Sequence, residues 1–223
     1  AHWTDGTLFD LEEVGRRARE VGAALVVDGT QTVGAHPFDL EAIRPDALIC
    51  AGYKWLLGPY GLGLAWLGER FRDAEPLEET WLGREGSEDF AGLVDYRETY
   101  RAGADRLDMG ERSQFLLGPM LAEALGLLEA WGVETVASRC RALTDRAARG
   151  ARSAGWRVEP PDGRCANIVG LGAPEGRDPA AVGRRLEERG VHVSLRGDAI
   201  RVSPHVYNTE DDVDALLEAL AEG

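Results

Sequence analysis

The chain has 223 residues, of which 44% are hydrophobic and 29% charged, and this composition indicates a globular protein with a substantial core rather than a disordered one. A net charge of −14 argues against nucleic-acid binding, because an acidic surface repels phosphate backbones. No apolar run reaches the roughly 18 residues of a membrane span, so we expect no membrane partner.

Helical and strand patterns alternate over the first third of the chain. Asp10 can cap a helix over 11–21, and Gly22 can end it. Three short and wholly apolar runs follow, at 23–27, 47–51 and 62–67. Runs of this length are typical of buried strands in parallel sheets, so the pattern predicts an α/β fold.

The rest of the chain divides into an irregular stretch and a second alternating region. Residues 73–113 have no helical or strand period, and a loop of that length is usually functional or interfacial. The patterns beyond it predict helices over 114–131, 134–154, 178–189 and 210–221 and strands over 166–171, 191–194 and 199–203. We therefore expect domains at 1–75 and 114–223, joined by an interface segment at 76–113.

Lys54 is the only lysine in the chain, against 24 arginines. Either this lysine remains by chance in a composition biased toward arginine, or it performs chemistry that a guanidinium cannot perform. Asp28 follows the first predicted strand and Lys54 the second, so both lie at one sheet edge, where ligands of α/β proteins bind. Asp28 can also simply cap a turn. A lysine and a carboxylate placed in this way suit pyridoxal phosphate (PLP), because the amine forms a Schiff base and the carboxylate keeps the pyridine nitrogen protonated.

Three motifs resemble one enzyme family. DGTQTVG at 28–34, AGYKWLLGPYG at 51–61 and IRVSPHVYNTEDDVDALLEAL at 200–220 are similar to segments of the class V aminotransferases, which are fold-type I PLP enzymes. The family includes cysteine desulfurases, kynureninases and isopenicillin N epimerase-like proteins. The resemblance implies the second half of a PLP-transferase large domain with a mainly parallel sheet, followed by a smaller α+β C-terminal domain.

The resemblance also implies roles for individual residues. Lys54 matches the Schiff-base lysine, and Asp28 matches the aspartate that pairs with the pyridine nitrogen. Gln31 matches the residue that hydrogen-bonds the phenolic oxygen of the ring, and Tyr53 the position that helps to hold the phosphate. Arg201 matches the arginine that binds the substrate α-carboxylate, although a surface arginine on a strand would look the same.

Two residues of the irregular segment are assigned by position. Trp81 and Ser113 fall where related enzymes reach across a dimer interface toward the cofactor phosphate of the neighbour, and Trp81 can equally be a packing residue. The resemblance therefore implies a homodimer. No histidine, cysteine or acidic cluster has metal-ligand spacing, so no metal is expected.

The implied activity is that of a PLP-dependent transferase acting on an amino acid, or on a substrate that contains one, through an external aldimine. Lys54 would form the internal aldimine and then act as general base at the α-carbon. Transamination, elimination, epimerisation and C–C cleavage remain open. The alternatives are a C–S or C–C lyase on the same scaffold, kynureninase-like or cysteine-sulfoxide-lyase-like, and a catalytically inactive fragment.

The cysteines limit these alternatives. Desulfurases need a nucleophilic cysteine shortly before the carboxylate-binding arginine, and 193–201 contains none, so persulfide chemistry is disfavoured. Cys50, Cys140 and Cys165 are widely spaced without a CxxC pair, which argues against disulfides and structural zinc and favours a reducing cytoplasm.

Family members run to about twice this length as the resemblance has it. The first residues resemble a loop cut from a longer protein, with no targeting segment. The half that precedes them in the family supplies a stacking aromatic, a phosphate-binding loop and part of the sheet. We therefore expect the isolated chain to bind PLP poorly.

Overall fold

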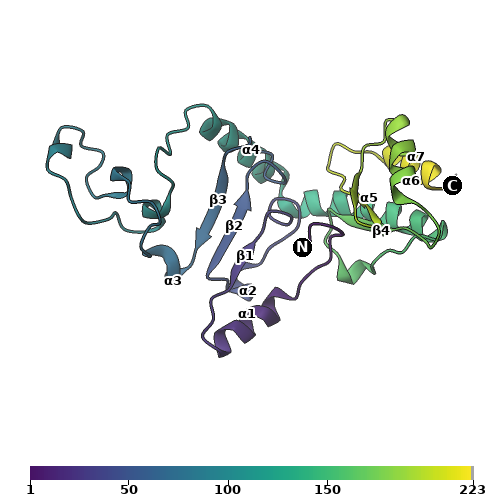
Figure 1. Cartoon of the computed structure of the whole chain (residues 1–223), viewed down its shortest axis with the longest axis horizontal. Helices are drawn as coiled ribbons and strands as arrows, with labels where there is room; N and C mark the ends of the chain where they lie inside the picture. Colours follow the sequence, from purple (N-terminus) through teal and green to yellow (C-terminus); the bar gives the residue numbers. More distant parts are fainter. Residues whose placement is uncertain (222–223) are drawn as a thin grey trace.

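The computed structural model describes residues 1–221, which form two small sheets linked by long helices (Figure 1). The first sheet has the order β1-β2-β3, with β1 at Val26–Asp28, β2 at Ala47–Ala51 and β3 at Gly63–Leu67. The second has the order β4-β6-β5, with β4 at Val169–Gly172, β5 at Ser194–Arg196 and β6 at Ala199–Val202. The alternation of helix and strand confirms the predicted α/β class.

The first sheet is preceded by helix α1, Leu11–Glu20, whose N-terminus is capped by Asp10 as predicted, because its carboxylate accepts from the Glu13 amide. The short helix α2, Leu40–Ile43, connects β1 to β2, and these two strands pair in parallel. The third strand differs from the prediction, since β3 pairs antiparallel with β2. An apolar run indicates a strand but does not specify its direction.

Only one face of the first sheet is covered. Val27, Leu48 and Cys50 point to one side and are buried in a core. Val26 and Ile49 point to the other side and are 54% and 48% exposed. The prediction of strands buried on both faces is therefore wrong within this chain, although the apolar residues on the open face are those that such burial requires.

An irregular arm, residues 73–113, projects away from the first sheet (Figure 1). It follows helix α3, Glu69–Arg72, and its only helical pieces are the 3₁₀ turns η1, Trp81–Gly83, η2, Gly92–Val94, and η3, Ala104–Leu107. Arg84 is its buried centre, with the guanidinium 3.8 Å from the centroid of the Tyr100 ring and a hydrogen bond to the Glu98 carbonyl. The arm therefore has internal structure despite its lack of periodicity.

Two long helices carry the chain from the arm to the second sheet. Helix α4 spans Leu117–Trp131, and α5 spans Val133–Ser153. Gly132 joins them at φ 77°, a left-handed conformation that glycine adopts without steric cost, and it ends α4 as predicted. The short 3₁₀ turn η4, Pro161–Gly163, then precedes β4.

The second sheet is antiparallel throughout and packs its apolar face on three helices. These are α5, α6 at Pro179–Glu188 and α7 at Glu210–Ala221. Asp178 caps α6 through the Ala180 amide, and the Thr209 hydroxyl accepts from the Asp212 amide at the start of α7. The core includes Leu143, Leu171, Leu186, Ile200 and Leu220, all fully buried.

The two sheets meet through α5 and the segment before β4. Cys140, Cys165 and Ile168 belong to the core of the first sheet although they lie late in the sequence. The Asn167 side-chain amide donates to the Gln31 carbonyl at 3.1 Å, which fixes the loop after β1 against the second half of the chain. Among residues 1–221, no helix is long and apolar enough to cross a membrane.

Candidate active site

The loop after β1 holds Asp28 and Gln31 beside the end of β2. The Asp28 carboxylate is exposed and accepts from the Thr30 amide at 2.9 Å, and the Thr30 hydroxyl accepts from the Ala51 amide at 3.0 Å. Asp28 therefore stabilises its own turn, as one interpretation of the sequence expected. The exposed carboxylate is at the same time accessible to a cationic ligand group.

Gln31 is oriented by two neighbours. Its side-chain oxygen accepts from the Trp55 indole at 3.3 Å, and its backbone oxygen accepts from Asn167. Because the acceptor end of the amide is used, its N–H groups remain for a ligand. This is the polarity that hydrogen bonding to an anionic ring oxygen needs.

Lys54 lies in the loop that follows β2, half-buried, with its Nζ 5.7 Å from the centroid of the Tyr53 ring. None of the ion pairs among residues 1–221 involves the ammonium group of Lys54. Tyr53 is exposed and stacks on Tyr60 at a centroid distance of 4.2 Å. The amine and the phenol thus stand next to each other at the sheet edge.

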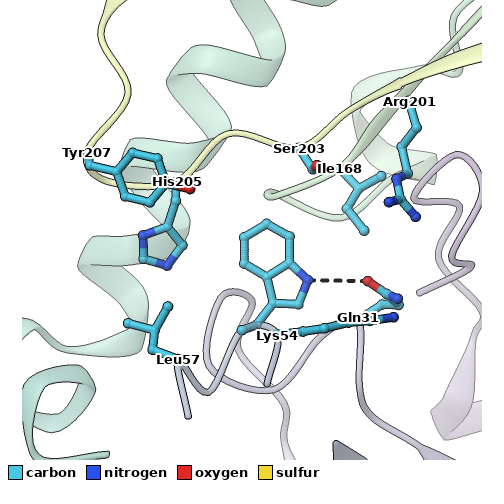
Figure 2. Close-up of a pocket in the computed structure, with 9 residues that line it drawn as sticks. Gln31, Lys54, Leu57, Ile168, Arg201, Ser203, His205 and Tyr207 are labelled. Carbon is cyan, nitrogen blue, oxygen red and sulfur yellow. Dashed lines mark hydrogen bonds between the residues drawn. The ribbon is translucent and has the colours of Figure 1, made fainter. Parts of the chain in front are cut away.

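Arg201 reaches this edge from the second sheet. Its Nη1 donates to the Trp3 carbonyl at 2.8 Å, and burial and the charge of Arg196 lower the pKa of its guanidinium. A cavity of about 250 Å³ brings Arg201 together with Lys54 and Gln31 (Figure 2). Its other lining residues are Trp55, Leu57, Ile168, Ser203, His205 and Tyr207.

A second cavity, of about 430 Å³, is lined by Asp28, Thr30, Gln31 and Lys54. The two cavities share Lys54 and Gln31. The structure therefore gathers Asp28, Gln31, Lys54 and Arg201 around these two cavities, although these residues come from both ends of the chain.

Trp81 and Ser113 lie outside this region. Both belong to the arm, where the Trp81 ring meets the edge of Phe90 at 5.8 Å and Ser113 is exposed. Within a single chain neither lines the two cavities around Lys54. Any contact with the site would have to be made with a second copy.

An aromatic wall that the sequence analysis did not assign lines the first cavity (Figure 2). The His205 ring stacks between Trp55 and Tyr207, with centroid distances of 5.7 and 5.5 Å. Burial lowers the pKa of His205, and its Nε2 is buried without a hydrogen-bond partner. His205 and Tyr207 stand in the same motif as Arg201, and this proximity was the available signal.

All three thiols are buried, which bears on the chemistry open to the site. Burial raises the pKa of Cys50 and of Cys140 to about 11, and the Asp28 charge adds to the effect at Cys50. Burial also raises the pKa of Cys165. None is a reactive thiolate at neutral pH.

Comparison with known proteins is consistent with this geometry. The aminotransferase class V family model matches residues 3–216. Isopenicillin N epimerase of Streptomyces clavuligerus is 32% identical over 97% of this chain and 57% of its own length. A probable cysteine desulfurase of Pyrococcus abyssi is 27% identical over 97% of this chain and 56% of its own.

Solved structures show the same fold. The cystine C–S lyase C-DES, solved with its product cysteine persulfide, superposes with a TM-score of 0.86 at 21% identity over 99% of this chain and 58% of its own. A variant of C-DES has been solved with glycine covalently linked to its PLP cofactor. The fold is therefore that of fold-type I PLP enzymes, as predicted.

The chain belongs to the class V aminotransferase family, because the family model covers most of its length. It spans little more than half the length of the curated relatives that it matches.

Proposed function

We propose that this chain forms part of a PLP-dependent enzyme of the class V aminotransferase type, which acts on an amino acid or on a substrate that contains one. The observation that supports this proposal best is the environment of the only lysine. Lys54 shares its cavities with a carboxylate, an amide and a guanidinium, contributed by Asp28, Gln31 and Arg201. An amine, an acid and a carboxylate-binding group are the components that such an enzyme needs.

The residues present fit the cofactor chemically. When bound, PLP supplies an aldehyde that bonds to amines and a ring that accepts electrons from the substrate α-carbon. Lys54 would attach it covalently, Asp28 would hold a proton on its ring nitrogen, and Gln31 would donate to its phenolic oxygen. Tyr53 is exposed beside Lys54, where its hydroxyl can donate to a phosphate oxygen.

Two residues would act on the substrate. Arg201 would bind the α-carboxylate, because its planar guanidinium forms paired hydrogen bonds with a carboxylate. Lys54, after release from the cofactor, would take the proton from the α-carbon as general base. Both line the cavity of about 250 Å³, which is large enough for a small amino acid.

The test is covalent trapping. We expect borohydride reduction in the presence of excess PLP to place one adduct on Lys54, located by mass spectrometry of peptides. Lys54→Arg keeps the charge and should show none, which separates the site from reaction at the N-terminal amine. Absence of a Lys54 adduct in the catalytically complete protein would contradict the proposal. In the same complete protein, turnover by Lys54→Ala would contradict it as well.

Transfer and lyase reactions use the same residues, and their products distinguish them. We propose transamination first, which yields a keto acid and the amine form of the cofactor. A C–S or C–C lyase would instead release pyruvate, alanine or ammonia. The buried thiols disfavour a lyase that passes sulfur to a protein cysteine, because none of the three is accessible.

We further propose a homodimer in which the arm contacts the partner, with Trp81 and Ser113 as the residues closest to the partner's site. The support is the exposure of apolar side chains on the arm, including Leu77 at 103% and Val94 at 86%. In this proposal 1–75 is the cofactor-binding part, 76–113 the interface segment and 114–223 the small domain. A cytoplasmic location would agree with the three free thiols.

A further inference from the structure

Arg196 and Arg201 occupy neighbouring positions on one face of the β5–β6 hairpin. The register pairs Ser194 with Arg201 and Arg196 with Ala199, so both arginines point away from the buried Ile200. Diagonal neighbours of this kind have side chains roughly 7–8 Å apart at their roots, within mutual reach of long side chains. Two like charges therefore share one small surface.

Both guanidinium groups contact the same residue of the N-terminal segment. Arg201 donates to the Trp3 carbonyl at 2.8 Å, and the Arg196 guanidinium lies 5.3 Å from the centroid of the Trp3 ring. Trp3 also lines the cavity that contains Asp28 and Lys54. Arg201 thus lines one cavity of the proposed active site, and Arg196 adjoins the other through the Trp3 ring.

Neither arginine has an acidic partner. The ion pairs of residues 1–221 include Arg146 with Asp214, Arg157 with Asp198 and Arg164 with Asp145, but none involves Arg196 or Arg201. Asp5, in the same segment as Trp3, is occupied by His2 and by the Thr7 amide. The positive charge of the pair is therefore not neutralised, in a chain with 39 acidic residues.

The hydrogen bonds of the pair are also incomplete. The Nε atoms of Arg196 and Arg201 are buried without a partner. Arg196 donates to the Leu195 carbonyl, and Arg201 donates to the Ser194 hydroxyl at 3.5 Å. Burial lowers the pKa of Arg201, and the charge of Arg196 lowers it further. An anion between the two groups would relieve both the repulsion and the unpaired donors.

We propose that Arg196 determines substrate class by binding a second carboxylate, so that the substrate is an amino acid whose side chain ends in an acidic group. This inference rests on the proposed function, since it takes Arg201 as the site of the α-carboxylate. A substrate with two carboxylates would satisfy both arginines at once. A substrate with a neutral side chain would leave the buried Nε of Arg196 unpaired, at a cost in affinity.

The test compares L-glutamate with L-glutamine, which are nearly identical in shape and differ in side-chain charge. Binding to the whole chain is followed by NMR through the indole N–H of Trp3, assigned with Trp3→Phe. We expect wild type to bind glutamate about 10-fold or more tightly than glutamine, as charged hydrogen bonds imply. Arg196→Gln should remove that preference by weakening glutamate alone, whereas Arg201→Gln should weaken both.

Arg157→Gln is the matched control, because it removes one exposed positive charge from the same hairpin region, where Arg157 pairs with Asp198. It should leave the preference intact. Equal loss of both amino acids in Arg196→Gln would overturn the inference and indicate a packing role against Trp3. Absence of any preference in wild type would overturn it too. If the preference holds while Lys54 of the catalytically complete protein forms no adduct with PLP, the proposed function fails and the two-carboxylate site stands.

Discussion

The reactivity of the Cys50 thiol depends on two features of its surroundings, its burial and the charge of Asp28. With a pKa of about 11, this thiol is ~0.1% ionised at pH 8, against ~25% for an ordinary thiol, so alkylation should be about 100-fold slower or more. The rate should rise with pH, since only the thiolate reacts. Asp28→Asn should accelerate it, because the Asp28 charge helps to raise the pKa.

Cys140 is the internal control for that experiment. Its pKa is also raised to about 11 by burial, but Asp28 does not contribute to the shift. Quantitative mass spectrometry of iodoacetamide adducts reads both thiols in one sample. Acceleration at Cys140 in Asp28→Asn would indicate general loosening of the fold rather than removal of one charge.

His205 and His36 make the stability of the fold depend on pH. Burial lowers the pKa of both in the folded state, with Arg141 also acting on His36. Below the unfolded pKa of about 6.5, the unfolded chain binds protons that the folded chain does not. The contribution of these histidines to the free energy of unfolding should therefore be level above pH 6.5 and fall as the pH decreases toward the folded values.

His205→Phe should reduce this slope, because it keeps the ring between Trp55 and Tyr207 and removes the titrating group. The contribution of one histidine cannot exceed about 1.4 kcal/mol per pH unit. Urea unfolding at several pH values measures the slope. The exposed His192, replaced by Gln, serves as control, and an unchanged slope in His205→Phe would contradict the assignment.

At the scale of elements, helix α5 is joined to the segment before β4 by an ion pair whose two side chains differ in burial. Arg164 has a side chain only 1% exposed, pairs with Asp145, which is 28% exposed, and donates to the Thr144 hydroxyl at 3.1 Å. Asp145→Ala would leave the buried guanidinium of Arg164 without an acidic partner, and should destabilise the fold by about 3 kcal/mol. Arg164→Met leaves a carboxylate that water can reach, so it should cost less.

Denaturant unfolding of the two single variants and of the double variant checks this order. The double variant should be more stable than Asp145→Ala alone, because it no longer contains the unpaired buried guanidinium. A larger loss in Arg164→Met than in Asp145→Ala would show that side-chain volume, not charge, determines the contribution of Arg164.

Local signals predicted the elements where the cause of the structure is local. Asp10 and Gly132 fix helix ends through a hydrogen bond or backbone conformation within a few residues, and both ends were predicted from the sequence. The direction of β3 and its exposure could not be predicted from the sequence, because they depend on which other strands and helices are present. Strand pairing is a long-range property.

In the candidate active site, too, some features could be predicted from the sequence and others depend on tertiary contacts. Asp28 and Lys54 follow predicted strands, so their meeting at one edge could be expected from topology alone. Arg201 lines the same cavity because the Asn167–Gln31 contact and the shared core join two parts of the chain more than a hundred residues apart. The roles of Trp55 and His205 in shaping the cavity depend on that tertiary contact and were missed.

At the scale of the whole molecule, large apolar side chains are exposed on the open face of the first sheet, on the arm, and at the start of α4, where Phe115 and Leu116 are 87% and 78% exposed. On the sheet, Val26 and Ile49 are exposed beside Ala65. On the arm, Phe90 is 75% and Val94 86% exposed, although Arg84 and Tyr100 hold the arm in a defined conformation. Patches of this kind on a structured segment mark association surfaces.

The arm provides the clearest prediction of assembly. Because Phe90 and Val94 are 75% and 86% exposed, replacing both with Asp should weaken self-association by about 10-fold or more, although it also removes the edge contact of the Phe90 ring with Trp81. Sedimentation equilibrium measures the association, and circular dichroism checks the fold. Asp95→Asn, an exposed polar change beside Val94, should have no effect. The pair Val26→Lys and Ile49→Lys tests the sheet face: if it abolishes association while the Phe90 and Val94 variant associates normally, the sheet and not the arm forms the contact between copies.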